Sequence, residues 1–60
     1  MKEQKMKLQV TMMNGDVRLI PGEKIVQEED YIMGWLLFLV DGQIVKFNPD
    51  SVAAFSICID

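Results

Sequence analysis

Few side chains of this 60-residue chain could do chemistry. Three acids stand together as Glu28, Glu29 and Asp30, one thiol lies near the C-terminus as Cys58, and there is no histidine. Glycosidase chemistry needs two carboxylates held across a cleft, whereas adjacent residues of a strand point to opposite sides. Without a histidine, no serine or cysteine has a recognisable base near it. We therefore expect no catalytic residues and no enzyme activity.

Metal and cofactor sites are not indicated either. One thiol cannot supply the four-ligand shell of zinc, and the acidic run lacks the alternating ligands and central glycine of a calcium loop. The four glycines are scattered and form no phosphate-binding motif. We expect no metal and no cofactor. Two interpretations of Glu28, Glu29 and Asp30 are open: a solvated charge run, or an acidic contact with a basic site on another protein.

Cys58 is the only cysteine, so a disulfide within one chain is excluded. A buried, inert thiol and an intermolecular disulfide or reactive thiol are both open, although the neighbouring Asp60 disfavours the thiolate that reactivity needs. A free thiol and the absence of a secretory signal favour a cytoplasmic protein. The longest apolar run, nine residues from Ile32 to Val40, is far shorter than the roughly 20 that span a membrane.

The composition predicts self-association. Half of the residues are apolar, yet a domain of this length buries only about 60% of the surface of its unfolded chain. Large exposed apolar patches on soluble proteins usually mark interfaces. Nine acids against six bases give a net charge of −3, which disfavours nucleic acid. We expect a homodimer or larger oligomer that also binds another protein, without nucleic-acid or membrane partners.

Alternation of apolar and polar residues with period two predicts an all-β single domain over residues 1–60, with residues 1–4 frayed. Two hairpins and a C-terminal strand give a small five-stranded antiparallel sheet or a partly open barrel. In the first hairpin, Asn14-Gly15 is a two-residue turn signal. Such a loop pairs Met12 with Val17 and Val10 with Leu19.

The second hairpin is predicted as Tyr31–Val40, a turn at Asp41-Gly42, and Gln43–Asn48. A helix over Tyr31–Val40 is the lesser alternative. The pairing gives two apolar faces: one holds Leu36, Phe38, Val40, Val45 and Phe47, and the other holds Trp35, Leu37, Leu39, Ile44 and Lys46.

The second of these faces supplies the candidate interface. Trp35, Leu37, Leu39 and Ile44 point away from the cluster that the hairpin packs on itself, and Tyr31 is a second aromatic residue close by. Aromatic side chains dominate binding energy at many interfaces. We expect these five residues to form an oligomer core or to contact a partner protein.

The rhythm of strands and turns resembles that of small barrels of the SH3 and Sm-like kind. The resemblance rests on Asn14-Gly15, Pro21-Gly22, a long bent strand, and Val45-Lys46-Phe47 leading through a short turn into Val52-Ala53-Ala54-Phe55. It implies an SH3-like partly open barrel and, as an alternative function, an oligomeric Sm-like RNA-binding protein. The chain is also similar in style to short proteins of Gram-positive bacteria and their phages, which implies a protein that clamps onto a host protein.

RNA binding would need a basic stripe beside aromatic side chains. The candidates are Lys2, Lys5, Lys7, Arg18 and Lys46, and the acidic run opposes them. The sequence therefore predicts a non-catalytic protein-binding module that acts as a homo-oligomer, such as a phage-type inhibitor of a host enzyme or defence protein. The Sm-like RNA-binding protein is the alternative.

Overall fold

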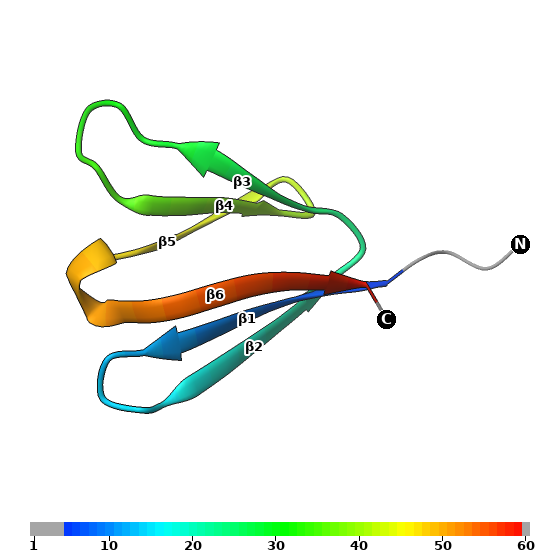
Figure 1. Ribbon diagram of the computed structural model, residues 1–60. Coiled ribbons are helices and arrows are strands. Elements are labelled where there is room, and N and C mark those ends of the chain that lie inside the picture. Colours follow the sequence, from blue (N-terminus) through cyan, green and yellow to red (C-terminus); the bar gives the residue numbers. More distant parts are fainter. Residues whose placement is uncertain (1–4, 60) are drawn as a thin grey trace, which may run out of the picture.

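The computed structural model describes residues 5–59 as six β-strands and one 3₁₀ turn (Figure 1). The elements are β1 (Met6–Met12), β2 (Val17–Gly22), β3 (Ile25–Glu29), β4 (Leu36–Val40), β5 (Gln43–Phe47), η1 (Pro49–Ser51) and β6 (Val52–Ile59). Two antiparallel three-stranded sheets result, in the orders β2-β1-β6 and β3-β4-β5. None of the described residues belongs to a helix long and apolar enough to cross a bilayer.

The all-β prediction is confirmed, and the five-stranded single sheet is wrong. β2 runs through Pro21 and Gly22, which pair with Lys7 and Met6, and the segment after them forms a full strand, β3, which pairs with β4 along its whole length. The strands divide between two sheets that do not close into a barrel. The fraying expected for residues 1–4 concerns positions outside the described residues.

Asp41 fixes the crossing from β2 to β3, where the chain passes from one sheet to the other. Its Oδ1 atom accepts hydrogen bonds from the backbone N–H groups of Glu23, at 3.0 Å, and Lys24, at 2.8 Å. Its own N–H donates to the carbonyl oxygen of Lys24 at 2.8 Å. Glu23 and Lys24 are the two residues that separate β2 from β3. Because the Asp41 carboxylate of the β4–β5 turn binds both of them, it holds the junction between the two sheets.

The first hairpin forms, but its predicted register is wrong by one residue. Val10 pairs with Arg18 rather than with Leu19, and Val17 pairs with Thr11. Because neighbouring strand residues face opposite sides, this shift turns Val17 and Leu19 outward, where they are 53% and 57% exposed.

The loop of this hairpin explains the shift. A two-residue type I′ turn needs positive φ at both central residues, and here only Gly15, at 95°, has it, not Asn14. The Gly15 N–H donates to the Met12 carbonyl at 3.0 Å, and the Met12 N–H donates to the Asp16 carbonyl at 2.7 Å. The loop therefore has three residues, a type I turn closed by a left-handed glycine.

The predicted turn and pairing of the second hairpin are confirmed. Asp41 and Gly42 have φ values of 51° and 83°, as a type I′ turn requires, and Val40 pairs with Gln43. The strand begins at Leu36, however, and residues 31–33 form a turn. The predicted start at Tyr31 and the helical alternative are both wrong.

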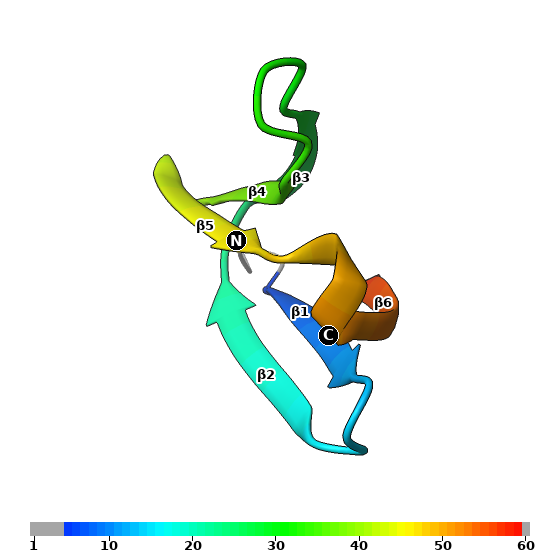
Figure 2. The same cartoon turned by 90° about the vertical axis from the view of Figure 1, so that its left-hand side faces the viewer.

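The core lies between the two sheets, which Figure 2 shows one above the other. Its buried side chains are Leu8, Val10, Ile25, Phe38 and Val40. Phe38 contacts Phe55 of the other sheet edge-to-face at a centroid distance of 5.2 Å, and Phe47 of its own sheet at 6.3 Å. This small core leaves the far side of each sheet uncovered.

Candidate interaction surface

The far side of sheet β3-β4-β5 is the most apolar uncovered surface. We call it the outer face, and it consists of Val26, Glu28, Trp35, Leu37, Leu39, Ile44 and Lys46. Strand alternation places the six strand residues among them opposite the core side chains of the same strands, and Trp35 directly precedes β4 at the edge of this face. Antiparallel register arranges six of them in two rows across the sheet: Glu28–Leu37–Lys46 and Val26–Leu39–Ile44.

The rows differ in chemistry. Ile44 is 65% exposed and Val26 is 39% exposed, while Leu37 and Leu39 on the central strand are half-buried by their neighbours. The row through Leu39 is wholly apolar, and the row through Leu37 ends in an acid on β3 and a base on β5. The outer face is thus an apolar centre with opposite charges on its two edges.

A loop at one end of the outer face extends this apolar surface. It connects β3 to β4, and we call it the 30–34 loop (Figure 1). Tyr31, Ile32 and Met33 follow one another there and are 88%, 90% and 71% exposed. Three consecutive large apolar side chains so open to solvent are unusual in a small domain.

Asp30 organises this loop. Its Oδ1 atom accepts hydrogen bonds from the N–H groups of Met33, at 2.9 Å, and Ile32, at 3.1 Å. Its carbonyl accepts from the N–H of Gly34 at 3.1 Å, and Gly34 has the positive φ of 76° that closes the loop. These bonds hold the exposed side chains on a defined backbone.

Local contacts shift the pKa values of two loop residues. The Met33 N–H, assisted by that of Ile32, holds the pKa of Asp30 below its ordinary value, despite partial desolvation. A hydrogen bond to the Glu29 carboxylate raises the pKa of the Tyr31 phenol, and the nearby charge of Glu28 acts in the same direction. At neutral pH the loop therefore carries an ionised Asp30 and a neutral Tyr31.

Two shallow hollows lie on this surface, and one of them joins the loop to the outer face. One, of about 410 Å³, is lined by Glu29, Asp30, Tyr31, Ile32, Leu37, Ile44 and Lys46. The other, of about 320 Å³, lies toward the β4–β5 turn and is lined by Lys24, Val26, Glu28, Leu39 and Gly42. Side chains of the loop and of the central strand therefore share one concavity.

Trp35 lies where the loop meets β4, and it positions Lys46. The ammonium of Lys46 lies over the indole ring, 5.7 Å from its centroid, a cation–π contact. Trp35 itself is half-buried. The contact keeps the charge of Lys46 at the β5 edge of the outer face.

The five predicted interface residues fall in one region. Leu37, Leu39 and Ile44 lie on the outer face, Trp35 lies at its edge, and Tyr31 shares a hollow with Leu37 and Ile44. Sequence reasoning missed Val26, Ile32 and Met33. The sequence signal for Ile32 and Met33 was the pair of Asp30 and Gly34, because an Asp side chain can bind the backbone two residues on and a glycine can supply positive φ.

The three acids do not form one acidic contact. Glu28 lies on the outer face opposite Leu37, and Glu29 points to the other side of β3, where it pairs with Leu36. Asp30 folds into its own loop. Glu28 is therefore the acid that the outer face presents.

The basic residues are likewise dispersed. Lys7 and Arg18 lie on opposite sides of sheet β2-β1-β6. Arg18 pairs with Val10 and shares its side, whereas Lys7 lies three residues before Val10 on β1 and so faces the other side. Lys46 belongs to the other sheet, and Lys2 lies outside the described residues. Cys58 is half-buried on the outward side of β6, with its sulfur 3.7 Å from the Ser56 hydroxyl.

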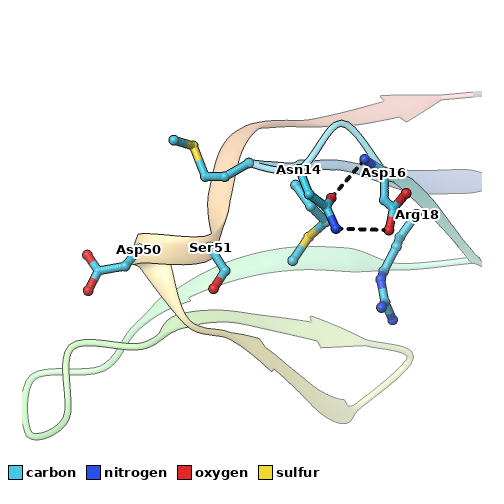
Figure 3. A pocket seen from close by; sticks show the side chains of 7 residues that line it. Asn14, Asp16, Arg18, Asp50 and Ser51 are labelled. Atoms are coloured by element: carbon cyan, nitrogen blue, oxygen red, sulfur yellow. Dashed lines mark hydrogen bonds between the residues drawn. The ribbon is translucent and has the colours of Figure 1, made fainter.

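A separate polar hollow of about 320 Å³ lies at the first hairpin turn (Figure 3). Two of its polar residues serve the turn: the Asp16 N–H donates to Asn14 Oδ1 at 3.0 Å, and Asn14 Nδ2 donates to Asp16 Oδ2 at 3.2 Å. Asp50 points away from that pair. Within residues 5–59, no three acid, thiol or imidazole side chains are grouped to hold a metal ion.

The outer face and the 30–34 loop are therefore the best-supported candidate site. Comparison with known proteins found no family model, no curated protein and no solved structure that matches this chain.

Proposed function

We propose that this chain is a non-catalytic protein-binding module that acts as a homo-oligomer through its outer face and 30–34 loop. The observation that carries the proposal is the shared hollow, in which Tyr31 and Ile32 of the loop line the same concavity as Leu37 and Ile44 of the sheet. Removing apolar surface of this kind from water contributes a favourable free energy of roughly 25 cal/mol per Å².

The preorganised loop supports a binding role. Ordering a flexible loop on binding costs free energy, and the bonds from Asp30 to the N–H groups of Ile32 and Met33 meet part of that cost beforehand. An aromatic and an aliphatic side chain held outward on such a loop can anchor in a pocket. We propose that a partner protein offers an apolar pocket that receives these loop side chains.

A protein that clamps onto a host enzyme or defence protein, as phage-type inhibitors do, fits this proposal. The alternative, an Sm-like RNA-binding protein, has less support. Lys7, Arg18 and Lys46 do not share a face, whereas binding single strands needs a continuous basic groove.

We also propose that the fold is a partly open barrel of the SH3-like kind. β2 and β3 are separated only by Glu23 and Lys24 and belong to different sheets, so together they act as one strand bent at these two residues. The short η1 turn then leads into β6, which returns to pair with β1.

Solution mass tests the proposed function. We expect the purified chain to sediment as an oligomer at micromolar concentration, and Leu37→Asp to sediment as a monomer with an unchanged far-ultraviolet circular dichroism spectrum. Leu19→Asp is the matched control, because Leu19 is 57% exposed on the other sheet, and it should associate like the parent. A parent chain that stays monomeric at millimolar concentration, or a fully associated Leu37→Asp, would refute the proposal.

A further inference from the structure

We propose that the occupant of the outer face is a second copy of this chain, packed face to face about a twofold axis parallel to β4. The inference deepens the proposed function and rests on it. A twofold interface must be self-complementary. If residue i of one copy contacts residue j of the other, residue j of the first copy also contacts residue i of the second. The outer face meets this condition in one orientation.

The charged row sets that orientation. Across the sheet the row runs from Glu28 on β3 through Leu37 on β4 to Lys46 on β5. An axis along β4 exchanges the two edges and keeps each row in place. Glu28 of each copy then faces Lys46 of the other, and Leu37 meets Leu37 at the axis.

The apolar row follows the same operation. Val26 on the β3 edge faces Ile44 of the second copy, and the two Leu39 side chains meet at the axis. The resulting interface has an apolar centre with one ion pair on each flank, which is the distribution typical of stable interfaces.

The twist of the sheets is compatible with these pairings. Packed sheets with aligned strands cross at about 30°. With strands about 4.8 Å apart, that rotation displaces an edge residue by about 2–3 Å relative to its mate, within the reach of Glu and Lys side chains. The leucine pairs on β4 lie nearer the pivot, because the two rows are only about 7 Å apart along the strand, and they are displaced less than the edge residues.

The other face-to-face orientation is electrostatically poor. A twofold axis across the strands exchanges the rows, so that Glu28 faces Val26 and Lys46 faces Ile44. Both charged groups then lose their water against apolar side chains and gain no oppositely charged partner, which costs free energy. Charge therefore selects the axis along β4 even though both orientations bury the leucines.

Trp35 contributes by holding Lys46 in place. Its ring contacts the ammonium at 5.7 Å, so the lysine loses less side-chain entropy when it pairs with Glu28 of the second copy. The axis along β4 also brings both 30–34 loops to the same end of the dimer, where they offer a third protein two equivalent sets of Tyr31, Ile32 and Met33.

Charge reversal tests the orientation. At low salt we expect Glu28→Lys and Lys46→Glu each to raise the dissociation constant of the dimer at least about tenfold, because each places like charges together at both flanks. An equimolar mixture of the two variants should form heterodimers, in which both flanks again join opposite charges. The double variant should return to within about threefold of the parent, and high salt should weaken all these effects.

Glu23→Lys is the matched control, since Glu23 is exposed and lies outside the outer face, and its dissociation constant should stay near that of the parent. Native mass spectrometry of the mixture reads out heterodimers directly. Single variants that dimerise as tightly as the parent, with no preference for heterodimers, would overturn the orientation. If Leu37→Asp still abolished association in that case, the proposed function would stand and only this pairing would fall.

Discussion

The ring of Phe38 meets the ring of Phe55 edge-to-face, with centroids 5.2 Å apart and planes inclined at 73°. Phe38 is fully buried on β4 and Phe55 is 39% exposed on β6, so this contact joins the two sheets. The neighbouring pair of Phe38 and Phe47 lies within one sheet. Phe38 is thus the side chain through which the layers are held together.

Replacing Phe38 with alanine should remove that link. Truncation of a buried phenylalanine costs about 3–5 kcal/mol, and a domain of this length has a free energy of unfolding of only about 3–9 kcal/mol. We expect Phe38→Ala to be largely unfolded at 37 °C by circular dichroism. Phe55→Ala should stay folded with a smaller loss, because Phe55 is partly exposed. Equal melting temperatures for the two variants would contradict this assignment.

Gly22 is required where the chain passes from β2 to β3. A Cβ atom there would lie 2.8 Å from Cγ1 of Val40, which is buried and short, and 3.3 Å from Asp41 Oδ2. We expect Gly22→Ala to lower the free energy of unfolding by about 1–3 kcal/mol, measured by urea denaturation. In a double-mutant cycle, Val40→Ala should remove most of that penalty, and additive effects would show that the clash is elsewhere.

Asp41 should contribute to stability through its two backbone acceptor bonds. Asp41→Ala leaves the N–H groups of Glu23 and Lys24 without the carboxylate and places alanine at a φ of 51°. We expect a loss of about 1–3 kcal/mol. Asp41→Asn keeps one acceptor oxygen and tolerates this φ, so it should lose clearly less. If both variants denature at the same urea concentration, these hydrogen bonds are not what holds the junction.

The second hairpin was predictable because its turn is determined locally. Asp41-Gly42 can provide positive φ at both central residues, and that geometry fixes the register and both faces. Asn14-Gly15 carries the same signal, yet it is compatible with a three-residue loop in which only the glycine is left-handed. The sequence pattern does not distinguish a two-residue loop from a three-residue loop. A loop longer by one residue shifts the register of β2 by one residue and so exchanges its two faces.

The division into two sheets depends on contacts that are distant in sequence. Asp41 binds the backbone 17 and 18 residues earlier, and Gly22 permits a close approach to Val40. Periodicity within each strand does not contain this information. The 30–34 loop has a local cause instead: hydrophobicity places Ile32 and Met33 in a strand, whereas the Asp30 side chain, two and three residues before them, binds their N–H groups and diverts the chain into a loop.

The 30–34 loop should loosen in acid. Because the Met33 and Ile32 N–H groups lower the pKa of Asp30 in the folded chain, its ionised form stabilises the loop at pH values above the unfolded pKa, near 4. That contribution is lost as the pH falls below about 4 and through the folded pKa. We expect the Ile32 and Met33 amide resonances to titrate together at that point and their hydrogen exchange, corrected for the intrinsic rate, to lose protection. In Asp30→Asn, which keeps an acceptor oxygen but does not ionise, both changes should disappear; a persistent transition in that variant would assign the effect to another carboxylate.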